Sequence, residues 1–593
     1  MEVILTLSNY GNDYTTFIKI SDKFEDLLFI NPKLPHKYFS RSVAIPSVIP
    51  DGFDKDKKDN SFRIFVFGGS TTVGYPYPTN ASFSRQLRRK LELLYPDVKF
   101  EVVNLGTAAV NSIFARELIN DVLEQEPDLI LIYMGHNEYF GVYGAASGDF
   151  YSGNYSLINI INKLKNLKIY QLFTDVVYRI SELFPGERLS NQTLMAIMAQ
   201  KNLVPKNSNI FINGLNLFEK NMDYILSACR NYRIPVFTGT LTSNLLQKPL
   251  DVIVKEKSTA EEYYNRAMID RQRGDRATSW KLLEQAKEYD ELRFRAPKEM
   301  NGIIKSLSKK YNFPVVNIDS VFSLNEGNAL IKSGLFVDHL HPNIRGYKLI
   351  ADSYYEKIRE MDLLRDFKKR ADIDTTIVDR ILIVTQPFTG LDSSFSDIKI
   401  EILLNSYPFV LNPDSRKILS SIELKDLNDS LAMQAVLNKK SWDDVHIELA
   451  EIKLRRKDYW GFFRELFTVI EDKPFYKYTY DLAVQKLMEA KKYHIAKIVL
   501  NKQKIYHPDK FLYKNLGICA LETGDIKNAI NKFEKSNRLF PNDPEINFRL
   551  SNAYFISGDV ESAMEAIDRC LFLKLDYPNA KNVKESLTRL LSE

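Results

Sequence analysis

The sequence has few cysteines, no long apolar run and little excess charge. Only three of its 593 residues are cysteine, at positions 229, 519 and 570, which excludes a disulfide framework and leaves no metal-binding cysteine spacing. No run of 18 apolar residues occurs, so we predict no membrane span within the chain. The formal net charge is +5, and without a long basic run this weak excess does not indicate nucleic-acid binding.

A chain of 593 residues is too long for one hydrophobic core, so we expect two or more domains. Residues 1–60 form a lead that we predict to be irregular and to end in a charged, solvated loop from Asp51 to Asn60. Beyond it, short apolar runs alternate with helical patterns, which predicts a doubly wound α/β sheet over residues 61–360. The apolar runs are residues 63–67, 102–105, 128–134, 235–239 and 314–319, and the helical patterns are residues 82–94, 112–125, 214–232 and 298–311. Ligands of such sheets bind at the carboxyl ends of the strands.

The last third of the sequence repeats with a period of about 34 residues. Equivalent turns are occupied by Asp458, Lys492, Asp525 and Asp559. The copy over residues 515–541 has Leu-Gly, Ala, Phe and Pro in an order that resembles the tetratricopeptide repeat (TPR), a helix pair that buries its apolar stripe against its neighbours. We predict about four copies over residues 442–593, a helical linker over 361–441, and one more TPR-like hairpin inserted at about 256–295.

A serine directly follows the first predicted strand, in Phe67-Gly68-Gly69-Ser70-Thr71-Thr72. The backbone N–H groups at a helix start are free and can stabilise an anion, so Ser70 is a candidate nucleophile. Other interpretations compete with this one. A phosphate loop would need lysine where Tyr75 stands, a nucleophile elbow would need glycine at Thr72, and a serine in this place most often only caps the helix.

A candidate base for this serine lies in the segment Asp338-His339-Leu340-His341-Pro342. A serine hydroxyl needs a base to remove its proton, and the base must be oriented by a third group. Asp338 stands three residues before His341 and can hold that imidazole in the required tautomer. The alternative is a metal site made of Asp338, His339 and His341. It leaves Ser70 unexplained, and we therefore expect no metal.

Two further elements supply candidate donors for an oxyanion, which acyl transfer needs. Gly106 follows the second predicted strand and offers a backbone N–H, and Gly135-His136-Asn137-Glu138 follows the third and offers the Asn137 side-chain amide. Each of these elements alone is better explained as a turn. Four such elements in order, all at strand ends, favour a reaction site, in which His136 and Glu138 are candidates for substrate binding.

The order of these elements resembles the block pattern of the SGNH/GDSL hydrolase family, over residues 62–255 and 296–360. The matching positions are Ser70 in the first block, Gly106 in the second, Asn137 in the third, and Asp338 with His341 in the Asp-x-x-His block. The resemblance implies a flavodoxin-like three-layer fold, ester hydrolysis through an acyl-enzyme, no cofactor, and an oxyanion hole made of two backbone N–H groups, those of Ser70 and Gly106, and the Asn137 side chain.

Two positions depart from the family pattern. Gly69 and Glu138 stand where the family usually has aspartate. The first position performs no chemistry in this scheme. The second bears on the geometry of the loop that carries Asn137.

Longer segments resemble a narrower group, bacterial SGNH hydrolase-like proteins that carry TPRs. These segments are residues 63–72, 135–141, 292–297 and 339–347. Members of the group commonly have a membrane anchor just before the segment that resembles Glu2–Gly11. The resemblance therefore implies an anchor upstream of this chain and an extracytoplasmic, membrane-associated location, with a cytoplasmic location as the alternative. It also implies a protein or peptide partner for the TPR array.

Two arginines follow the inserted hairpin. Arg293 and Arg295 are one residue apart and would share a face of an extended strand. They are candidates for binding a carboxylate or phosphate of the substrate. The alternative is a structural role, in ion pairs with Asp290 or Glu291 that join the hairpin to the α/β domain.

The sequence therefore predicts a serine hydrolase acting on ester bonds, with carbohydrate and lipid esters as candidate substrates. His341, oriented by Asp338, would deprotonate Ser70, which attacks the ester carbonyl. Two alternatives stay open. One is an O-acyltransferase, in which a hydroxyl group rather than water accepts the acyl group. The other is a catalytically silent domain that binds a ligand on a TPR scaffold.

Overall fold

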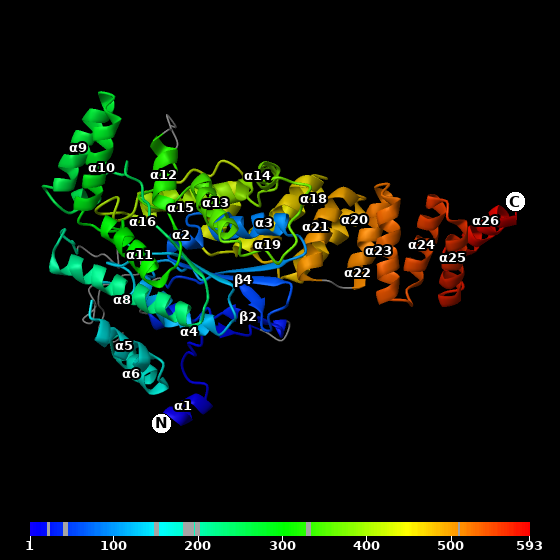
Figure 1. Cartoon of the computed structure of the whole chain (residues 1–593), viewed down its shortest axis with the longest axis horizontal. Helices are drawn as coiled ribbons and strands as arrows, with labels where there is room; N and C mark the ends of the chain where they lie inside the picture. The colour runs from blue at the N-terminus through cyan, green and yellow to red at the C-terminus, as the bar shows by residue number, and fades with distance from the viewer. Residues whose placement is uncertain are drawn as a thin grey trace. The chain divides into compact units, whose positions relative to one another are not determined.

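A computed structural model describes residues 1–593 apart from 21–23, 40–44, 148–152, 182–194, 196–201, 328–333, 508–509 and 593. The chain divides into two compact units, Met1–Lys439 and Lys440–Glu593, whose elements are drawn in Figure 1. Among the described residues, no helix is both long and apolar enough to span a membrane.

A five-stranded parallel sheet forms the centre of the first unit, in the order β5-β4-β6-β7-β8. Its strands are β4 (Ser61–Gly68), β5 (Lys99–Asn104), β6 (Leu129–Tyr133), β7 (Val236–Gly239) and β8 (Val315–Val316). In chain order this is 2-1-3-4-5, the order of flavodoxin-like sheets, whose ligands bind where the strand order reverses, here beside β4 and β6. Every residue of β4 and β6 is buried, which is why β6 and residues 64–67 of β4 are continuous apolar runs. The predicted α/β fold is confirmed.

Helices cover both faces of this sheet. One layer contains α3 (Phe83–Leu94) and α13 (Ile344–Glu360), and the other contains α4 (Ser112–Leu123), α8 (Asn209–Asn231) and α11 (Lys298–Tyr311). In Figure 1, α3 and α13 lie above β4, whereas α4 and α8 lie below it. Other described elements of this unit are α2 (Ser70–Val73), α5 (Tyr155–Lys165), α6 (Lys168–Ser181), α12 (Ile318–Gly327) and the 3-10 helices Leu34–Lys37, Thr79–Ala81 and Asp251–Ile253.

Helix α3 illustrates how the sequence specifies these layers. Phe83, Leu87, Leu91 and Leu94 recur at helical spacing, and all four side chains are fully buried. The side chain of Ser82 accepts a hydrogen bond from the backbone N–H three residues later, which satisfies one of the free donors of the first turn. The apolar stripe and the cap together fix where the helix begins and which face meets the sheet.

The N-terminal lead contains a three-stranded antiparallel sheet and is therefore not irregular. Its elements are α1 (Glu2–Leu7), β1 (Phe17–Ile18), β2 (Leu27–Ile30) and β3 (Gly52–Asp54). The prediction of a solvated loop over Asp51–Asn60 is wrong for Asp51–Asp54, because Asp51 and Asp54 are buried, whereas residues 55–60 are largely exposed. Asp51 accepts a hydrogen bond from Arg85 Nη1 (2.9 Å), and Asp54 pairs with Lys99 Nζ (2.7 Å). Buried carboxylates need such partners, and here the partners lie far along the sequence.

Two helical segments are joined to the sheet domain. The hairpin expected at 256–295 is present as α9 (Thr259–Gln272) packed on α10 (Arg276–Tyr289). The segment 361–441, expected to be a linker, is helical but belongs to the first compact unit as far as Lys439. Its helices are α14 (Thr375–Val384), α15 (Gly390–Leu404), α16 (Ser415–Ser421) and α17 (Leu427–Val436).

The second unit is all-α over its described residues, and each helix packs on the next one along the chain. The helices are α18 (Trp442–Arg455), α19 (Tyr459–Asp472), α20 (Lys477–Glu489), α21 (Tyr493–Tyr506), α22 (Lys510–Glu522), α23 (Ile526–Leu539), α24 (Pro544–Ser557), α25 (Val560–Leu573) and α26 (Ala580–Ser592). Successive pairs bury their apolar faces against their neighbours, as a helical solenoid requires. The predicted all-α array is confirmed.

The repeated residues of this array have clear local roles. Asp458, Asp525 and Asp559 cap α19, α23 and α25, because each side chain accepts a hydrogen bond from a backbone N–H of the helix it precedes. A Cβ on Gly517 would lie 2.6 Å from the ring of Phe533, so the Leu-Gly and Phe positions of the repeat allow two helices to pack closely.

Candidate active site

The candidate nucleophile Ser70 is the first residue of α2, directly beyond the end of β4. Two glycines precede it, and neither position has room for a side chain. A Cβ on Gly68 would lie 2.5 Å from the carbonyl oxygen of Tyr133, and one on Gly69 would lie 2.8 Å from Asn137 Nδ2. An aspartate at residue 69 would therefore require the Asn137 side chain to shift.

The structure brings Ser70, His341 and Asp338 into one hydrogen-bonded row. Nε2 of His341 lies 2.8 Å from Ser70 Oγ, and Nδ1 lies 2.5 Å from Asp338 Oδ2. An ionised carboxylate can only accept a hydrogen bond, so Nδ1 carries the proton and Nε2 presents its lone pair to the hydroxyl. In this arrangement His341 is able to take the proton of Ser70.

Further hydrogen bonds hold the Asp338 loop in place. Oδ1 of Asp338 accepts from the N–H groups of Leu340 (2.8 Å) and His341 (2.7 Å), and Asn244 Nδ2 donates to the Asp338 carbonyl (2.9 Å). Burial alone would raise the pKa of the Asp338 carboxyl, but His341 and His339 hold it well below its ordinary value. The aspartate therefore stays charged and keeps the imidazole oriented.

Gly106 does not direct its N–H toward the row. That N–H donates to Asn104 Oδ1 at 2.8 Å, and Gly106 does not line the cavity over Ser70. The Asn104 amide also donates to the carbonyl of Thr72 (2.7 Å). Gly106 thus helps to fix the turn beneath the serine, and its N–H is already used.

Ala109, which the sequence did not single out, lies beside the serine instead. Ala108 and Ala109 line the cavity together with Ser70 and Asn137. Ala109 has a φ of +62°, a left-handed conformation that is uncommon for alanine, and no described residue accepts a hydrogen bond from its N–H. A non-glycine residue gives no sequence signal of positive φ, so this donor was missed.

Asn137 keeps one amide hydrogen for a ligand. Its Nδ2 donates to the carbonyl of Val110 at 2.9 Å, which uses one of the two hydrogens on that nitrogen. The same nitrogen lies against the Cα of Gly69, next to the nucleophile. The remaining N–H is therefore placed beside Ser70 at the floor of the cavity.

His136 and Glu138 lie behind the site, since neither lines the cavity. Glu138 accepts hydrogen bonds from the N–H (2.8 Å) and Oγ (2.7 Å) of Ser112 at the start of α4. His136 Nδ1 accepts from the Ala296 N–H (3.2 Å). Burial raises the pKa of Glu138 to about 7 and lowers that of His136 to about 3. Both side chains therefore fix the loop that carries Asn137.

Arg293 and Arg295 are buried away from the cavity, and both guanidinium groups donate to protein groups, although Arg295 Nε has no partner among the described residues. Arg293 Nε donates to the carbonyl of Val204 (2.8 Å). Arg295 pairs with Asp290 (2.9 Å) and donates to the carbonyl of Asn244 (3.0 Å). These contacts fit the structural role proposed as the alternative to substrate binding. Arg295 also supports the asparagine that holds the Asp338 loop.

Asp338, His339 and His341 could each offer one ligand atom to a metal, within 4.8 Å of one another. The hydrogen bonds of the Ser70 row already use both nitrogens of His341 and one oxygen of Asp338. His339 packs against the ring of Phe294 (5.9 Å between ring centres), and burial lowers its pKa. The atoms that a metal would need thus coincide with those that orient the base.

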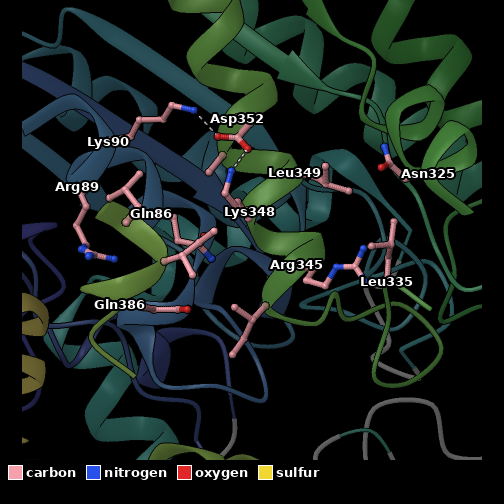
Figure 2. A pocket seen from close by; sticks show the side chains of 14 residues that line it. Gln86, Arg89, Lys90, Asn325, Leu335, Arg345, Lys348, Leu349, Asp352 and Gln386 are labelled. Carbon is pink, nitrogen blue, oxygen red and sulfur yellow. Dashed lines mark hydrogen bonds and ion pairs between the residues drawn. The ribbon is translucent and has the colours of Figure 1, made fainter. Parts of the chain in front are cut away.

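Two cavities of the first unit differ in their chemistry. The cavity over Ser70 and His341 has a volume of about 820 Å³. Figure 2 shows the other, of about 460 Å³, where Lys90 and Lys348 both reach Asp352 at 2.7 and 2.6 Å. Among the described residues that line it there is no serine, cysteine or histidine. Its two lysines are paired with carboxylates, whereas Ser70 and His341 line the first cavity.

A family comparison bears on the second unit. Residues 520–587 match the family model of the tetratricopeptide repeat, which confirms this repeat type over that part of the predicted array. No curated protein matches the sequence.

Among solved structures, the chain is similar to the acetyl xylan esterase AlAXEase, at 12% identity over 50% of this chain and 100% of that one, with a TM-score of 0.27. It is also similar to a lipolytic protein of the G-D-S-L family from Desulfitobacterium hafniense (16% identity, 50% and 98% of the chains, TM-score 0.24) and to the MamA protein (16% identity, 25% and 88% of the chains, TM-score 0.22). Because these identities and TM-scores are low, the chemistry of the site rests on its own geometry.

Proposed function

We propose that the first unit is a serine hydrolase that cleaves ester bonds through an acyl-enzyme. The observation that carries this proposal is the row Ser70–His341–Asp338 at the floor of an open cavity, with distances of 2.8 and 2.5 Å. A serine that only capped a helix would need no imidazole on its hydroxyl, and a structural histidine would need no access to a cavity.

The reaction has two stages. His341 Nε2 removes the Ser70 proton as Oγ attacks the ester carbonyl, and the imidazolium then protonates the leaving alcohol oxygen. Water attacks the acyl-enzyme in the second stage, again through His341, and releases the acid and the free serine. Asp338 stays ionised throughout and stabilises the imidazolium.

The oxyanion hole in this proposal differs from the one expected from the sequence. Its donors are the Ser70 N–H, the free amide hydrogen of Asn137 and the Ala109 N–H, which takes the place of Gly106. Ala109 and Asn137 line the cavity with the nucleophile, whereas the Gly106 N–H is bonded to Asn104. Donors fixed in advance around the developing negative charge stabilise the transition state without reorganisation.

Covalent labelling tests the enzyme proposal. A fluorophosphonate probe should label the full-length wild type and not Ser70→Ala, and p-nitrophenyl ester hydrolysis should fall by about 10⁶-fold in that variant. Ser47→Ala is a matched control, because Ser47 is an exposed serine of the same cavity and should keep both activities. A folded wild type that is neither labelled nor active would contradict the proposal and favour a silent binding domain. Product analysis with added alcohols separates hydrolysis from acyl transfer.

We also propose that the second unit binds a protein or peptide. The support is the TPR match over residues 520–587 and the continuous stacking of α18–α26. Crosslinking in cells, followed by mass spectrometry, should recover a partner whose crosslinks fall within residues 440–593. Crosslinks confined to the first unit would contradict this assignment.

A further inference from the structure

The cavity over Ser70 has a roof that the sheet domain does not supply. On α15, Phe395, Lys399, Ile402 and Leu403 line the cavity, at spacings that place them on one face of the helix. Apolar residues of α16 and α17 complete this roof, among them Ile418 and Leu419. A long apolar wall of this kind suits an acyl chain better than a sugar, which needs many hydrogen-bonding side chains.

One cation lies within this apolar roof. Lys399 Nζ lies 4.7 Å from the ring centre of Tyr75 and 5.0 Å from that of Phe395. The Tyr75 ring in turn packs on the imidazole of His341, with 4.6 Å between ring centres. Lys399 is therefore separated from the catalytic histidine by a single aromatic ring.

No carboxylate of the described chain pairs with Lys399. The residues that line the cavity include no aspartate or glutamate, and among the described residues no ion pair or side-chain hydrogen bond involves the Lys399 ammonium. Burial lowers its pKa to about 8. The contrast with Figure 2 is direct, since there the buried Lys90 and the half-buried Lys348 both meet an aspartate. Two aromatic rings attract the cation, but they leave its charge uncompensated.

We propose that this cavity binds an amphiphilic ester whose apolar chain lies against α15–α17 and whose anionic group, a carboxylate or a phosphate, pairs with Lys399. The inference rests on the proposed function, because it names the substrate class of the same site. Lys399 is half-buried, and a substrate that fills the cavity removes more water from its ammonium. That desolvation is costly without a counter-charge, and an anionic group on the substrate offsets the cost. Neutral esters fill the same apolar space without this gain.

The kinetic test uses esters that differ only in charge. Probes with the anion in the acyl part are 4-nitrophenyl half-esters of butanedioic, hexanedioic and octanedioic acid. Each is matched to the neutral diester in which the free carboxyl is a methyl ester and the 4-nitrophenyl ester is kept. Lysophosphatidic acid and the monoacylglycerol with the same acyl chain place the distinguishing phosphate in the alcohol part. In the wild type kcat/KM should favour the anionic member of at least one series, and Lys399→Met should reduce that ratio about 10- to 100-fold. The series that responds identifies the source of the anion.

Two further variants make the result specific. Lys399→Arg keeps the positive charge and should keep the preference for the anionic ester. Lys417→Met removes an exposed lysine of α16, in the same roof but outside the cavity, and should leave the ratio unchanged. Equal ratios in wild type and Lys399→Met, in both series, would overturn the proposal.

Labelling and binding separate this inference from the proposed function. If the fluorophosphonate labels Ser70 but anionic esters are not preferred, only the inference fails. Calorimetry with Ser70→Ala provides a readout that needs no turnover: dodecanoate should bind more tightly than 1-dodecanol, and the additional Lys399→Met change should remove the difference. If that difference is present while the wild type is neither labelled nor active, the anion site stands and the enzyme proposal fails.

Discussion

Each unit of the chain contains a buried histidine that hydrogen-bonds to a carboxylate. In the first unit, His341 Nδ1 lies 2.5 Å from Asp338, and in the second, His446 Nδ1 lies 2.6 Å from Glu465. Neighbouring groups hold the pKa of both carboxyls below the ordinary value, against the effect of burial. The two pairs are thus nearly the same chemically.

Their surroundings are what distinguish them. The second nitrogen of His341 meets Ser70 Oγ, and the imidazole lines an open cavity. His446 and Glu465 are both 0% exposed, and Glu465 also accepts a hydrogen bond from Lys453 at 2.6 Å. A histidine–carboxylate pair becomes a candidate for catalysis only where a nucleophile and a substrate space adjoin it. Elsewhere it joins two helices, here α18 and α19.

The largest effect expected from this comparison follows from Asp338→Asn. An asparagine side chain favours the wrong tautomer of His341, so kcat should fall by about 10⁴-fold while Ser70 and the fold remain. The measurement is ester hydrolysis by the purified full-length variant, with circular dichroism to verify folding. A loss of less than tenfold in a folded protein would mean that the two pairs do not differ in the way proposed.

The next largest effect concerns the oxyanion donors beside Ser70. They belong to the first site and are no part of the His446–Glu465 pair. Asn137→Ala removes the side-chain donor beside Ser70 and should lower kcat by about 10²- to 10³-fold with little change in KM. Gly106→Ala is an informative contrast, because the Gly106 N–H is bonded to Asn104 and a Cβ there would lie 2.8 Å from the backbone nitrogen of Val73. It should mainly lower the melting temperature. Similar kinetic losses without destabilisation would return Gly106 to the oxyanion hole.

The sequence identifies much of this site because its signals are local. Ser70 follows an apolar strand, and Asp338 and His341 share one short loop, so residue type and spacing are enough to propose the row. The positions of the five strands along the chain and their burial are readable for the same reason, since each strand is a short apolar run between helical patterns.

The remaining features depend on geometry that residue types do not encode. The direction of the Gly106 N–H and the positive φ of Ala109 are properties of the folded loop. Asp51 looks solvated until Arg85 is placed beside it. Lys399 enters the cavity only because α15 packs over Ser70, a contact between segments more than 300 residues apart.

Replacing the carboxylate of the His446–Glu465 pair by an amide should have a different result from Asp338→Asn. Glu465→Gln removes the charge that Lys453 and His446 share, and breaking a buried pair in this way costs about 3 kcal/mol of unfolding free energy. Ester hydrolysis should be unchanged. Urea unfolding followed by tryptophan fluorescence measures the effect, because Trp442 packs on His446 with 4.4 Å between ring centres.

The pH dependence of that stability has a defined sign. The pKa of Glu465 is lower in the folded chain than its ordinary value, so its contribution is complete above the unfolded pKa of about 4.3 and is lost as the pH falls through the folded pKa. Wild type and Glu465→Gln should therefore converge in stability in acid. A difference that stays constant below pH 4, or any loss of esterase activity at neutral pH, would contradict the structural role.

The smallest effect concerns Lys399, which, unlike the two histidines, has no carboxylate partner among the described residues. Its ammonium has a pKa of about 8, so the preference for anionic esters should be full below that pH and decline by about tenfold above it. The other titratable side chains of the cavity are Tyr75, His339 and His341. Burial raises the pKa of Tyr75 and lowers that of His339, and His341 acts on anionic and neutral esters alike. The ratio of the kcat/KM values for the anionic and the neutral ester therefore isolates the effect of the lysine.

Lys399→Arg supplies the control, because its guanidinium stays charged at pH 10 and should keep the preference for the anionic ester there. A wild-type ratio that does not change between pH 6 and pH 10, or one that falls equally in the arginine variant, would show that the charge of this residue does not select the substrate.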